Sequence, residues 1–346
     1  MRKVFLSADQ NSPSKTFYAE EAYGLALGQS AGATWSVAAD KEGLWSLPVM
    51  LAPIEGYGWE ASSPYGYPGI FADRSLGNKE IAEFWAATLD ALRENGVVSL
   101  FLRFPPYSYP GLEVAAFSGL PGLELKIISQ TIEVPTDIDA DGIWTAMAGR
   151  ARTAVRKAEK LGMTAQVVEA DESSLGSHSS FRQLYGETMR RIGAATHHVY
   201  ESSYYSTLVS RLKERIYVVE VRNSAGRPAA CAMILTDDRV VHYHLSGSNP
   251  PDARSGANNL LLWTILRWAS DRGYKSVHLG GGLTANDPLF KFKESFGGHS
   301  RDFTVGRVVV NAELYNILSE KRAQSLGISL TELRTRSFFP VFRAEL

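Results

Sequence analysis

The feature that most constrains the fold is a run of three strand-like segments in the second half of the chain. They cover residues 216–222, 228–236 and 240–247 and consist largely of aliphatic and aromatic residues. The connections at 223–226 and 237–238 contain the Asn, Ser, Gly and Asp residues typical of tight turns. Strands joined by such short turns pair antiparallel, so the sequence predicts an antiparallel meander at the centre of the second half.

Helical and strand patterns lie on both sides of this meander. Before it we predict a helix over 143–161 that ends at Gly162, a strand over 165–169, and helices over 179–192 and 202–215. After it we predict a helix over 257–272, a strand over 276–279 that runs into Gly280, Gly281 and Gly282, a helix over 288–295, a strand over 302–310 and a terminal helix. This mixture predicts an α+β fold, with mixed and mostly antiparallel sheets flanked by helices.

The first half follows a similar mixed pattern. We predict a helix over 14–28, a hairpin of strands over 34–39 and 44–51, a helix over 78–94, and strands over 97–103 and 125–134. Residues 135–142 are acidic, turn-forming and poor in apolar side chains, which is typical of a domain boundary. A chain of 346 residues is therefore expected to form two domains.

Charge and composition exclude several classes of protein. The formal net charge is −1, so no general basic field can hold a long nucleic acid, and any such contact must be local. The single cysteine, Cys231, excludes disulfide frameworks and cysteine zinc sites, and its apolar surroundings indicate a buried residue. The sequence has neither a signal peptide pattern nor a long apolar run, which predicts a cytoplasmic protein without membrane insertion.

Basic residues concentrate in two predicted helices. Arg152, Arg156 and Lys160 follow one another at intervals of four, so they share a helix face that could contact phosphates or simply be solvated. Lys291 and Lys293 are two positions apart and point in different directions on a helix. One of them could hold a phosphate or stabilise charge on a carbonyl oxygen, and the alternative is two surface lysines.

Aromatic and histidine residues are the remaining candidates. Tyr65 and Tyr67 lie in a Gly- and Pro-rich aromatic loop that could contact a sugar, a base or a peptide, or could pack on its own rings. His242 and His244 alternate on a predicted strand and are expected to share a face. Since no carboxylate stands beside them in the local sequence, we predict no metal site.

Five segments of the second half form an ordered set of motifs. They are 150–163, 185–193, 241–248, 279–282 and 292–297, the last of which reads Phe-Lys-Glu-Ser-Phe-Gly. In this order the segments resemble the FemABX family and its relatives within the acetyltransferase superfamily. The resemblance covers residues 143–310, and over the first half it is one of topology only.

The resemblance implies two tandem acetyltransferase-like domains. The first would span 1–136 on the acceptor side and be completed by the C-terminal segment 312–346, and the second would span 137–311 on the donor side. The best-known members of the family move an amino acid from aminoacyl-tRNA to the amine of a peptidoglycan precursor. Close relatives do the same in natural-product pathways, and other relatives act on polysaccharides or use acyl-CoA.

Donor-side residues follow from the motif match. The resemblance implies that Lys293 contacts the donor near the reacting ester and that Phe292 stacks beside it, which makes these two the predicted catalytic residues. The helix with Arg152, Arg156 and Lys160, together with Lys291, would lie along tRNA or another phosphate surface.

Acceptor-side residues are predicted in both halves of the chain. Arg190, Arg191 and Tyr243 fall where the family holds its acceptor. Tyr65, Tyr67 and Asp73 occupy a loop at a comparable topological place in the first half, and Asp73 is also the candidate general base.

The predicted function is amide-bond formation, in which the amine of a small-molecule or nucleotide-linked acceptor attacks aminoacyl-tRNA. We predict no cofactor and no particular oligomeric state. An alternative is an acyl-CoA-dependent N-acyltransferase that acts on an amino sugar, and another is a non-catalytic RNA- or glycan-binding protein. The helix entrance at residues 254–259 has one glycine and lacks the glycine-rich loop that binds the CoA pyrophosphate in acetyltransferases, which disfavours CoA.

Overall fold

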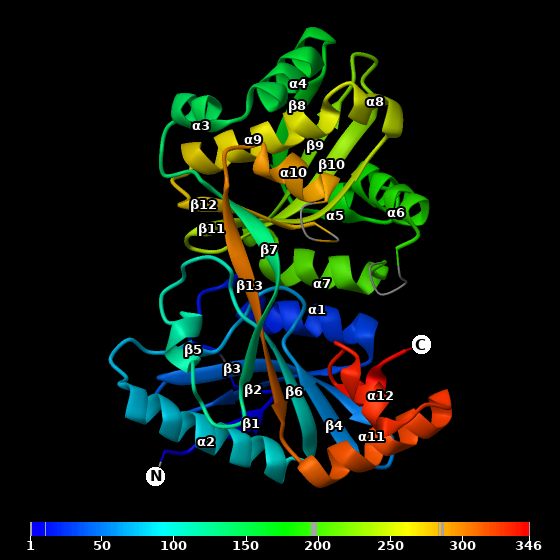
Figure 1. Ribbon diagram of the computed structural model, residues 1–346. Coiled ribbons are helices and arrows are strands. Elements are labelled where there is room, and N and C mark those ends of the chain that lie inside the picture. The colour runs from blue at the N-terminus through cyan, green and yellow to red at the C-terminus, as the bar shows by residue number, and fades with distance from the viewer. Residues whose placement is uncertain (1, 11, 195–198, 283, 285–286, 346) are drawn as a thin grey trace. The chain divides into compact units, whose positions relative to one another are not determined.

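The computed structural model describes residues 2–10, 12–194, 199–282, 284 and 287–345. The chain forms two compact units (Figure 1). Unit 1 comprises 1–28, 32–128 and 303–346, and unit 2 comprises 29–31 and 129–302. The chain passes from unit 1 to unit 2 within strand β7 (Glu124–Pro135) and returns within strand β13 (His299–Val309).

Unit 1 contains one sheet in the order β1-β2-β3-β4-β6-β13, in which only β4 and β6 pair parallel. Its strands are β1 (Phe5–Ser7), β2 (Thr34–Ala39), β3 (Trp45–Ile54), β4 (Gly58–Ser62) and β6 (Val97–Arg103), and the short β5 (Phe71–Ala72) pairs with β3. Its helices are α1 (Glu21–Ala31), α2 (Asn78–Glu94), α11 (Ala312–Leu326) and α12 (Leu330–Thr335).

Helix α2 shows how local sequence and packing agree in unit 1. The Glu80 side chain accepts a hydrogen bond from the backbone N–H of Gly77 at 3.0 Å, which satisfies a free amide at the start of the helix. Its buried positions include Ile81, Phe84 and Trp85, at the helical spacing of three to four residues, and they join the main core of the unit. The predicted helix over 78–94 is confirmed.

Unit 2 contains a sheet in the order β7-β12-β11-β10-β9-β8, in which only β11 and β12 pair parallel. Its further strands are β8 (Thr164–Glu169), β9 (Ile216–Arg222), β10 (Pro228–Thr236), β11 (Val240–Ser248) and β12 (Ser276–Gly281). Its helices are α3 (Ala140–Ala146), α4 (Gly149–Lys160), α5 (Glu172–Leu175), α6 (Ser180–Ile192), α7 (Ser202–Leu212), α8 (Pro250–Arg254), α9 (Ala257–Asp271) and α10 (Pro288–Glu294). The predicted meander is β9-β10-β11, and the predicted fold class is confirmed.

The strands of unit 1 and those of unit 2 repeat one pattern of pairing. In each, three antiparallel pairs are followed by one parallel pair and then by another antiparallel pair. The parallel pairs differ in extent. β4 pairs with β6 from Trp59 to Ser62, with a register shift after Trp59, whereas β11 pairs with β12 only from Val240 to His242. Beyond His242 the two described strands of unit 2 separate.

Two predicted helices differ from the structure. The helix expected over 143–161 is divided into α3 and α4, because Met147 and Ala148 are extended and the N–H of Ala148 donates to the carbonyl of Ser295. The helix expected over 14–28 consists of a 3-10 turn at Phe17–Ala19 and then α1, which begins only at Glu21. At the break between α3 and α4, the carbonyl of Ser295, distant in the sequence, replaces the helical acceptor of the Ala148 N–H.

None of the helices in the described part of the chain is long and apolar enough to span a membrane.

Candidate active site

Lys293 is the buried cation of unit 2. Its side chain extends from α10, is 7% exposed, and donates a hydrogen bond from Nζ to the carbonyl oxygen of Gly281 at 2.6 Å. Burial lowers the pKa of Lys293 from its usual 10.5 to about 8, and the negative charge of Asp287 opposes this change. The amine therefore remains mainly charged at neutral pH, in a place where its charge is only weakly screened.

The geometry around α10 explains why the motif contains these residue types. Asp287 caps the helix, since its carboxylate accepts the N–H of Phe290 at 2.7 Å, and Pro288 occupies the first helical position. Gly297 has a φ of +83°, and a Cβ there would lie 2.9 Å from the backbone of Ala146. The glycine after the second phenylalanine thus lets α10 end close against α3.

The separation of β11 from β12 creates the place into which Lys293 reaches. Between Tyr243 and Leu245 the pairing of β11 with β10 shifts register, so His244 is the extra residue of a β-bulge. The bulge interrupts the regular alternation of β11 at His244. On the other strand, Gly280 has a φ of +70°, and a Cβ there would lie 3.5 Å from Lys293 Nζ.

Tyr243, a predicted acceptor-side residue, lies beside Lys293 at this opening. Lys293 Nζ lies 6.0 Å from the centroid of the half-buried Tyr243 ring, within the range of a cation–π contact. Burial raises the pKa of Tyr243 to about 12, so its hydroxyl remains protonated at neutral pH. Phe292 is half-buried, and its ring packs edge-to-face on Phe296 at 5.4 Å.

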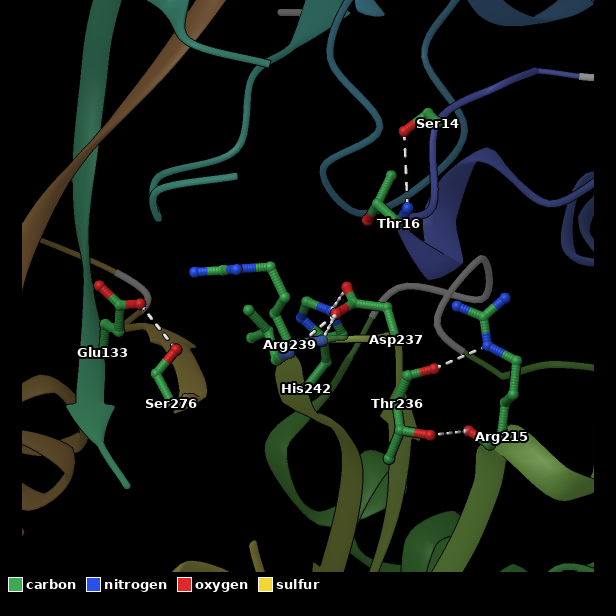
Figure 2. A network of polar contacts seen from close by, with 10 residues as sticks. Ser14, Thr16, Glu133, Arg215, Thr236, Asp237, Arg239, His242 and Ser276 are labelled. Atoms are coloured by element: carbon green, nitrogen blue, oxygen red, sulfur yellow. Dashed lines mark hydrogen bonds and ion pairs between the residues drawn. The ribbon is translucent and has the colours of Figure 1, made fainter. Parts of the chain in front are cut away.

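A row of buried polar side chains follows the neighbouring strands β11, β12 and β7, and Figure 2 shows part of it. His242 Nε2 lies 3.0 Å from Asp237 Oδ2, and the side chains of both residues are at most 1% exposed. The ring centroid of His278 lies 6.2 Å from that of His242. Burial, together with the nearby His242 and the charge of Lys293, lowers the pKa of His278 well below its usual value. His278 is thus neutral, and it places no second positive charge beside Lys293.

The last residue of this row is Glu133, whose carboxylate accepts hydrogen bonds from two side chains. Glu133 accepts the hydroxyl of Ser276 at 2.7 Å and Nε of Arg301 at 2.8 Å. Such contacts satisfy the carboxylate and indicate a structural role for Glu133.

Two of the three basic side chains on the face of α4 contact other residues of unit 2. Arg152 donates to the carbonyl oxygens of Trp144 and Thr145 at 3.3 and 3.0 Å, which caps the C-terminal end of α3. The guanidinium carbon of Arg156 lies 5.1 Å from the centroid of a Trp144 ring. Lys160 is exposed. Arg152 and Arg156 therefore have structural partners beside any role toward phosphate.

A pocket of about 480 Å³ opens between α4, α9 and α10. Lys291 and Phe292 line it together with Arg150 and Asn259, which the sequence analysis did not single out as site residues. Arg150 carried a visible signal, since it is a further basic residue of the helix that bears Arg152, Arg156 and Lys160. The contact of α4 with α10 is made by residues 141 positions apart in the chain, so the sequence pattern could not reveal it.

The two arginines predicted on the acceptor side lie at the end of α6. Arg191 donates to the carbonyl of Ser248 and to the hydroxyl of Thr188, at 3.2–3.3 Å. Arg190 is exposed and donates to the carbonyl of Gly186 at 3.3 Å. Arg191 thus joins α6 to the end of β11, whereas Arg190 faces solvent.

The two predicted tyrosines of the aromatic loop in unit 1 differ in their exposure to solvent. Tyr65 is 40% exposed, and the guanidinium carbon of Arg103 lies 5.6 Å from its ring centroid. The Tyr67 ring instead packs edge-to-face against the rings of Tyr18, Tyr107 and Phe303, at 5.7, 6.3 and 5.1 Å. Burial raises the pKa of Tyr67. Tyr65 is the accessible ring, whereas Tyr67 packs on rings from outside the loop.

Asp73 accepts two hydrogen bonds from Ser75, one from the N–H at 2.9 Å and one from the hydroxyl at 2.6 Å. These bonds lower the pKa of the Asp73 carboxyl. A carboxylate with a lowered pKa is a weaker base, and it is suited to holding a cation instead.

The fold and this site define a class of protein. Residues 146–294, which lie in unit 2, match the family model described as an acetyltransferase (GNAT) domain. A search of curated protein sequences gives no match.

The fold is similar to that of FemX. Its crystal structure matches with a TM-score of 0.69 at 13% sequence identity, over 88% of this chain and 95% of the FemX chain. The structure of L-PGS from Bacillus licheniformis matches with a TM-score of 0.55 at 14% identity, over 86% and 93% of the two chains. The C-terminal domain of a protein assigned as a lysylphosphatidylglycerol synthetase from Agrobacterium fabrum matches with a TM-score of 0.53 at 15% identity, over 87% and 91%. At these identities the likeness concerns the fold, and at that level the predicted resemblance to FemABX-like members of the GNAT class is confirmed.

Proposed function

We propose that the protein forms an amide bond by transferring an aminoacyl group from aminoacyl-tRNA to the amine of a small-molecule or nucleotide-linked acceptor. The observation that carries the proposal is the buried ammonium of Lys293, which lies at the point where β11 and β12 separate. Unit 2 would hold the donor and unit 1 the acceptor.

The proposed step is direct transfer. The acceptor nitrogen bonds to the ester carbonyl carbon, the ester C–O bond breaks, and the proton lost by nitrogen ends on the departing ribose oxygen. Negative charge develops on the carbonyl oxygen in between, and Lys293 is proposed to stabilise it. Its hydrogen bond to Gly281 fixes the direction of Nζ before substrate arrives.

The one thiol of the chain supports a mechanism without a covalent enzyme intermediate. Cys231 is fully buried in β10, and burial together with the charge of Glu220 raises its pKa. The thiolate that would act as a nucleophile is therefore disfavoured. Much of the rate acceleration would come from holding donor and acceptor in reacting geometry.

The entrance of α9 supports RNA over CoA as the donor. The N–H groups of Ser255 and Gly256 donate to the carbonyls of Asp252 and Ala253, at 2.9 and 3.1 Å, so these two amides are engaged. Gly256 serves packing, because a Cβ there would lie 2.4 Å from the carbonyl oxygen of Ala154 on α4. Both observations weigh against a backbone cradle for a pyrophosphate at this loop.

The proposal keeps Tyr65, Tyr67 and Asp73 as acceptor residues within unit 1. Within unit 2 it keeps Arg190, Arg191 and Tyr243. The lowered pKa of Asp73 favours a role in binding a cationic acceptor over a role as general base. The exposed ring of Tyr65 offers a surface for a sugar or a base.

The test is a transfer assay with a charging extract, labelled amino acids and a pool of small metabolites, with and without RNase. Transfer of label that RNase abolishes supports the tRNA donor and identifies the amino acid. Transfer that resists RNase and requires acyl-CoA supports the alternative donor, and absence of turnover with every donor supports a binding protein. Lys293→Met should reduce transfer at least about 100-fold, the effect expected for one oxyanion donor.

A further inference from the structure

Strand β11 contains an extra residue directly beside the proposed oxyanion lysine. Tyr243 is the register partner of Ile234 and Leu245 that of Met233, so His244 has no partner on β10. A β-bulge of this kind adds one residue to a strand and redirects the side chains around it. Bulges are frequent next to active sites, and this one directly follows the tyrosine whose ring centroid lies 6.0 Å from the ammonium of that lysine.

The bulge brings Tyr243 and Ser246 to the same face of β11. Residues three apart on a regular strand point to opposite faces. Here their partners on β10 are Ile234 and Ala232, which are two apart, so both residues lie on one face of the sheet. The side chain of Ser246 contacts the Tyr243 hydroxyl there and partly offsets the effect of burial on its pKa. The position of the Tyr243 ring beside Lys293 therefore depends on the bulge.

Helix α7 holds His244, the extra residue of the bulge. The Tyr204 hydroxyl lies 3.0 Å from His244 Nε2, at hydrogen-bond distance, and Tyr204 is fully buried. The Tyr204 ring stacks on Tyr200 at a centroid distance of 4.1 Å and meets Tyr205 edge-on at 5.1 Å. The partner of the bulge thus belongs to a packed aromatic cluster.

His244 is uncharged at neutral pH. Burial and the nearby His242 lower the pKa of His244 to about 3. A neutral imidazole has one donor and one acceptor nitrogen, and a tyrosine hydroxyl can pair with either. The hydrogen bond to Tyr204 is therefore retained at neutral pH, and a ring with so low a pKa is a poor general base.

His242, which precedes Tyr243, also has a buried partner. Its Nε2 lies 3.0 Å from Oδ2 of Asp237, and Oδ1 of the same carboxylate accepts the N–H groups of Arg239 and Val240 at 2.9 and 2.8 Å. Tyr243 therefore stands between two histidines whose rings are both held. The turn between β10 and β11 holds the first, and α7 holds the second.

We propose that Tyr204 and His244 are positioning residues, whose hydrogen bond holds the bulge of β11 and so places the Tyr243 ring against Lys293. The face of that ring attracts the ammonium and restricts where Nζ can lie. The inference rests on the proposed function, because Lys293 is the proposed stabiliser of the oxyanion in that reaction. Both residues act through Tyr243 and not on the substrate.

The first test needs no substrate. Protein labelled with ¹³C-lysine gives an NMR signal for the ε-methylene of Lys293, which is assigned by its loss in Lys293→Met. Because an aromatic ring shifts the resonances of nuclei near its face, Tyr243→Leu shows how much of the shift this ring causes. Tyr204→Phe and His244→Leu should each move the signal toward its position in Tyr243→Leu. His244→Gln should keep it near the wild-type position, since the glutamine amide can replace the imidazole Nε2.

Tyr205→Phe is the matched control. It removes the hydroxyl of the neighbouring buried tyrosine of α7, which has no hydrogen-bond partner among the described residues, and should leave the Lys293 signal unchanged. Circular dichroism checks folding, and if Tyr204→Phe does not fold, the comparison of His244→Leu with His244→Gln carries the test. Equal effects of Tyr204→Phe and Tyr205→Phe on the signal, or the same signal in His244→Gln and His244→Leu, would overturn the proposal.

A second measurement uses the transfer reaction. Tyr204→Phe should lower kcat about 10- to 100-fold, the effect of a small misplacement of reacting groups, and leave KM for both substrates unchanged. A rise in KM without a fall in kcat would assign the pair to substrate binding and overturn the positioning role. If the wild type shows no transfer, the proposed function fails, whereas the Lys293 signal still decides whether Tyr204 and His244 place the Tyr243 ring.

Discussion

The burial of Lys293 should be measurable as a pH-dependent cost in stability. A lysine with a pKa of about 8 in the folded protein and 10.5 in the unfolded chain holds fewer protons when folded over that interval. The unfolded state binds more protons there, so the stability contributed by this group rises with pH between 8 and 10.5. Below pH 8 the folded protein bears the full cost, which is about 3 kcal/mol for this difference in pKa.

The perturbation is Lys293→Met, which removes the charge and keeps most of the length. Integrating the two titrations gives a change of about 2 kcal/mol between pH 7 and pH 9.5 in the wild-type contribution of Lys293. The free energy of unfolding of Lys293→Met relative to wild type should therefore fall by about 2 kcal/mol over this interval.

The assay is urea denaturation followed by circular dichroism at pH 7, 8, 9 and 9.5. Lys291→Met serves as the control, because it removes an exposed lysine from the same helix and should show no such pH dependence relative to wild type. A constant difference between Lys293→Met and wild type at all four pH values would refute the argument. The pKa of Lys293 would then be the same in the folded and the unfolded protein.

Further predictions concern the surroundings of this lysine and the buried row. Asp287→Asn should keep the helix cap but lower the pKa of Lys293 further, so the fall of the transfer rate through about pH 8 should move to lower pH in a pH–rate profile. Gly297→Ala places a side chain at a φ of +83° and should destabilise the protein by more than about 1 kcal/mol in thermal unfolding. His242→Leu leaves the Asp237 carboxylate without its partner at 3.0 Å and should cost about 1–3 kcal/mol in denaturant unfolding, a loss that His242→Gln partly restores.

The elements that depend on local signals could be predicted from the sequence. The helix over 78–94 has apolar residues at helical spacing and an acid three positions after its cap, and the strand over 97–103 follows directly. The meander has short turns that permit only antiparallel neighbours. For these elements local preference and tertiary packing agree, so the pattern suffices.

The features that depend on distant partners could not be predicted. The break between α3 and α4 needs the carbonyl of Ser295, and the role of Arg152 as a cap of α3 exists only because of that break. The bulge at His244 changes the register of β11 in a way that no alternation of side chains reveals. Lys293 could be singled out from its motif, but its burial and its hydrogen bond to Gly281 come from how α10 packs beside β12.

The return of the chain into unit 1 through β13 has a consequence for the order in which the protein can fold during synthesis. The strand that pairs with β6 contributes Val305 to Val309, which leave the ribosome after every residue of unit 2. The backbone groups of β6 that pair with β13 therefore remain without this partner strand until the whole of unit 2 has been translated. Unit 2 has all of its residues once Asp302 has emerged, so the later-encoded unit is expected to be the first that can finish folding.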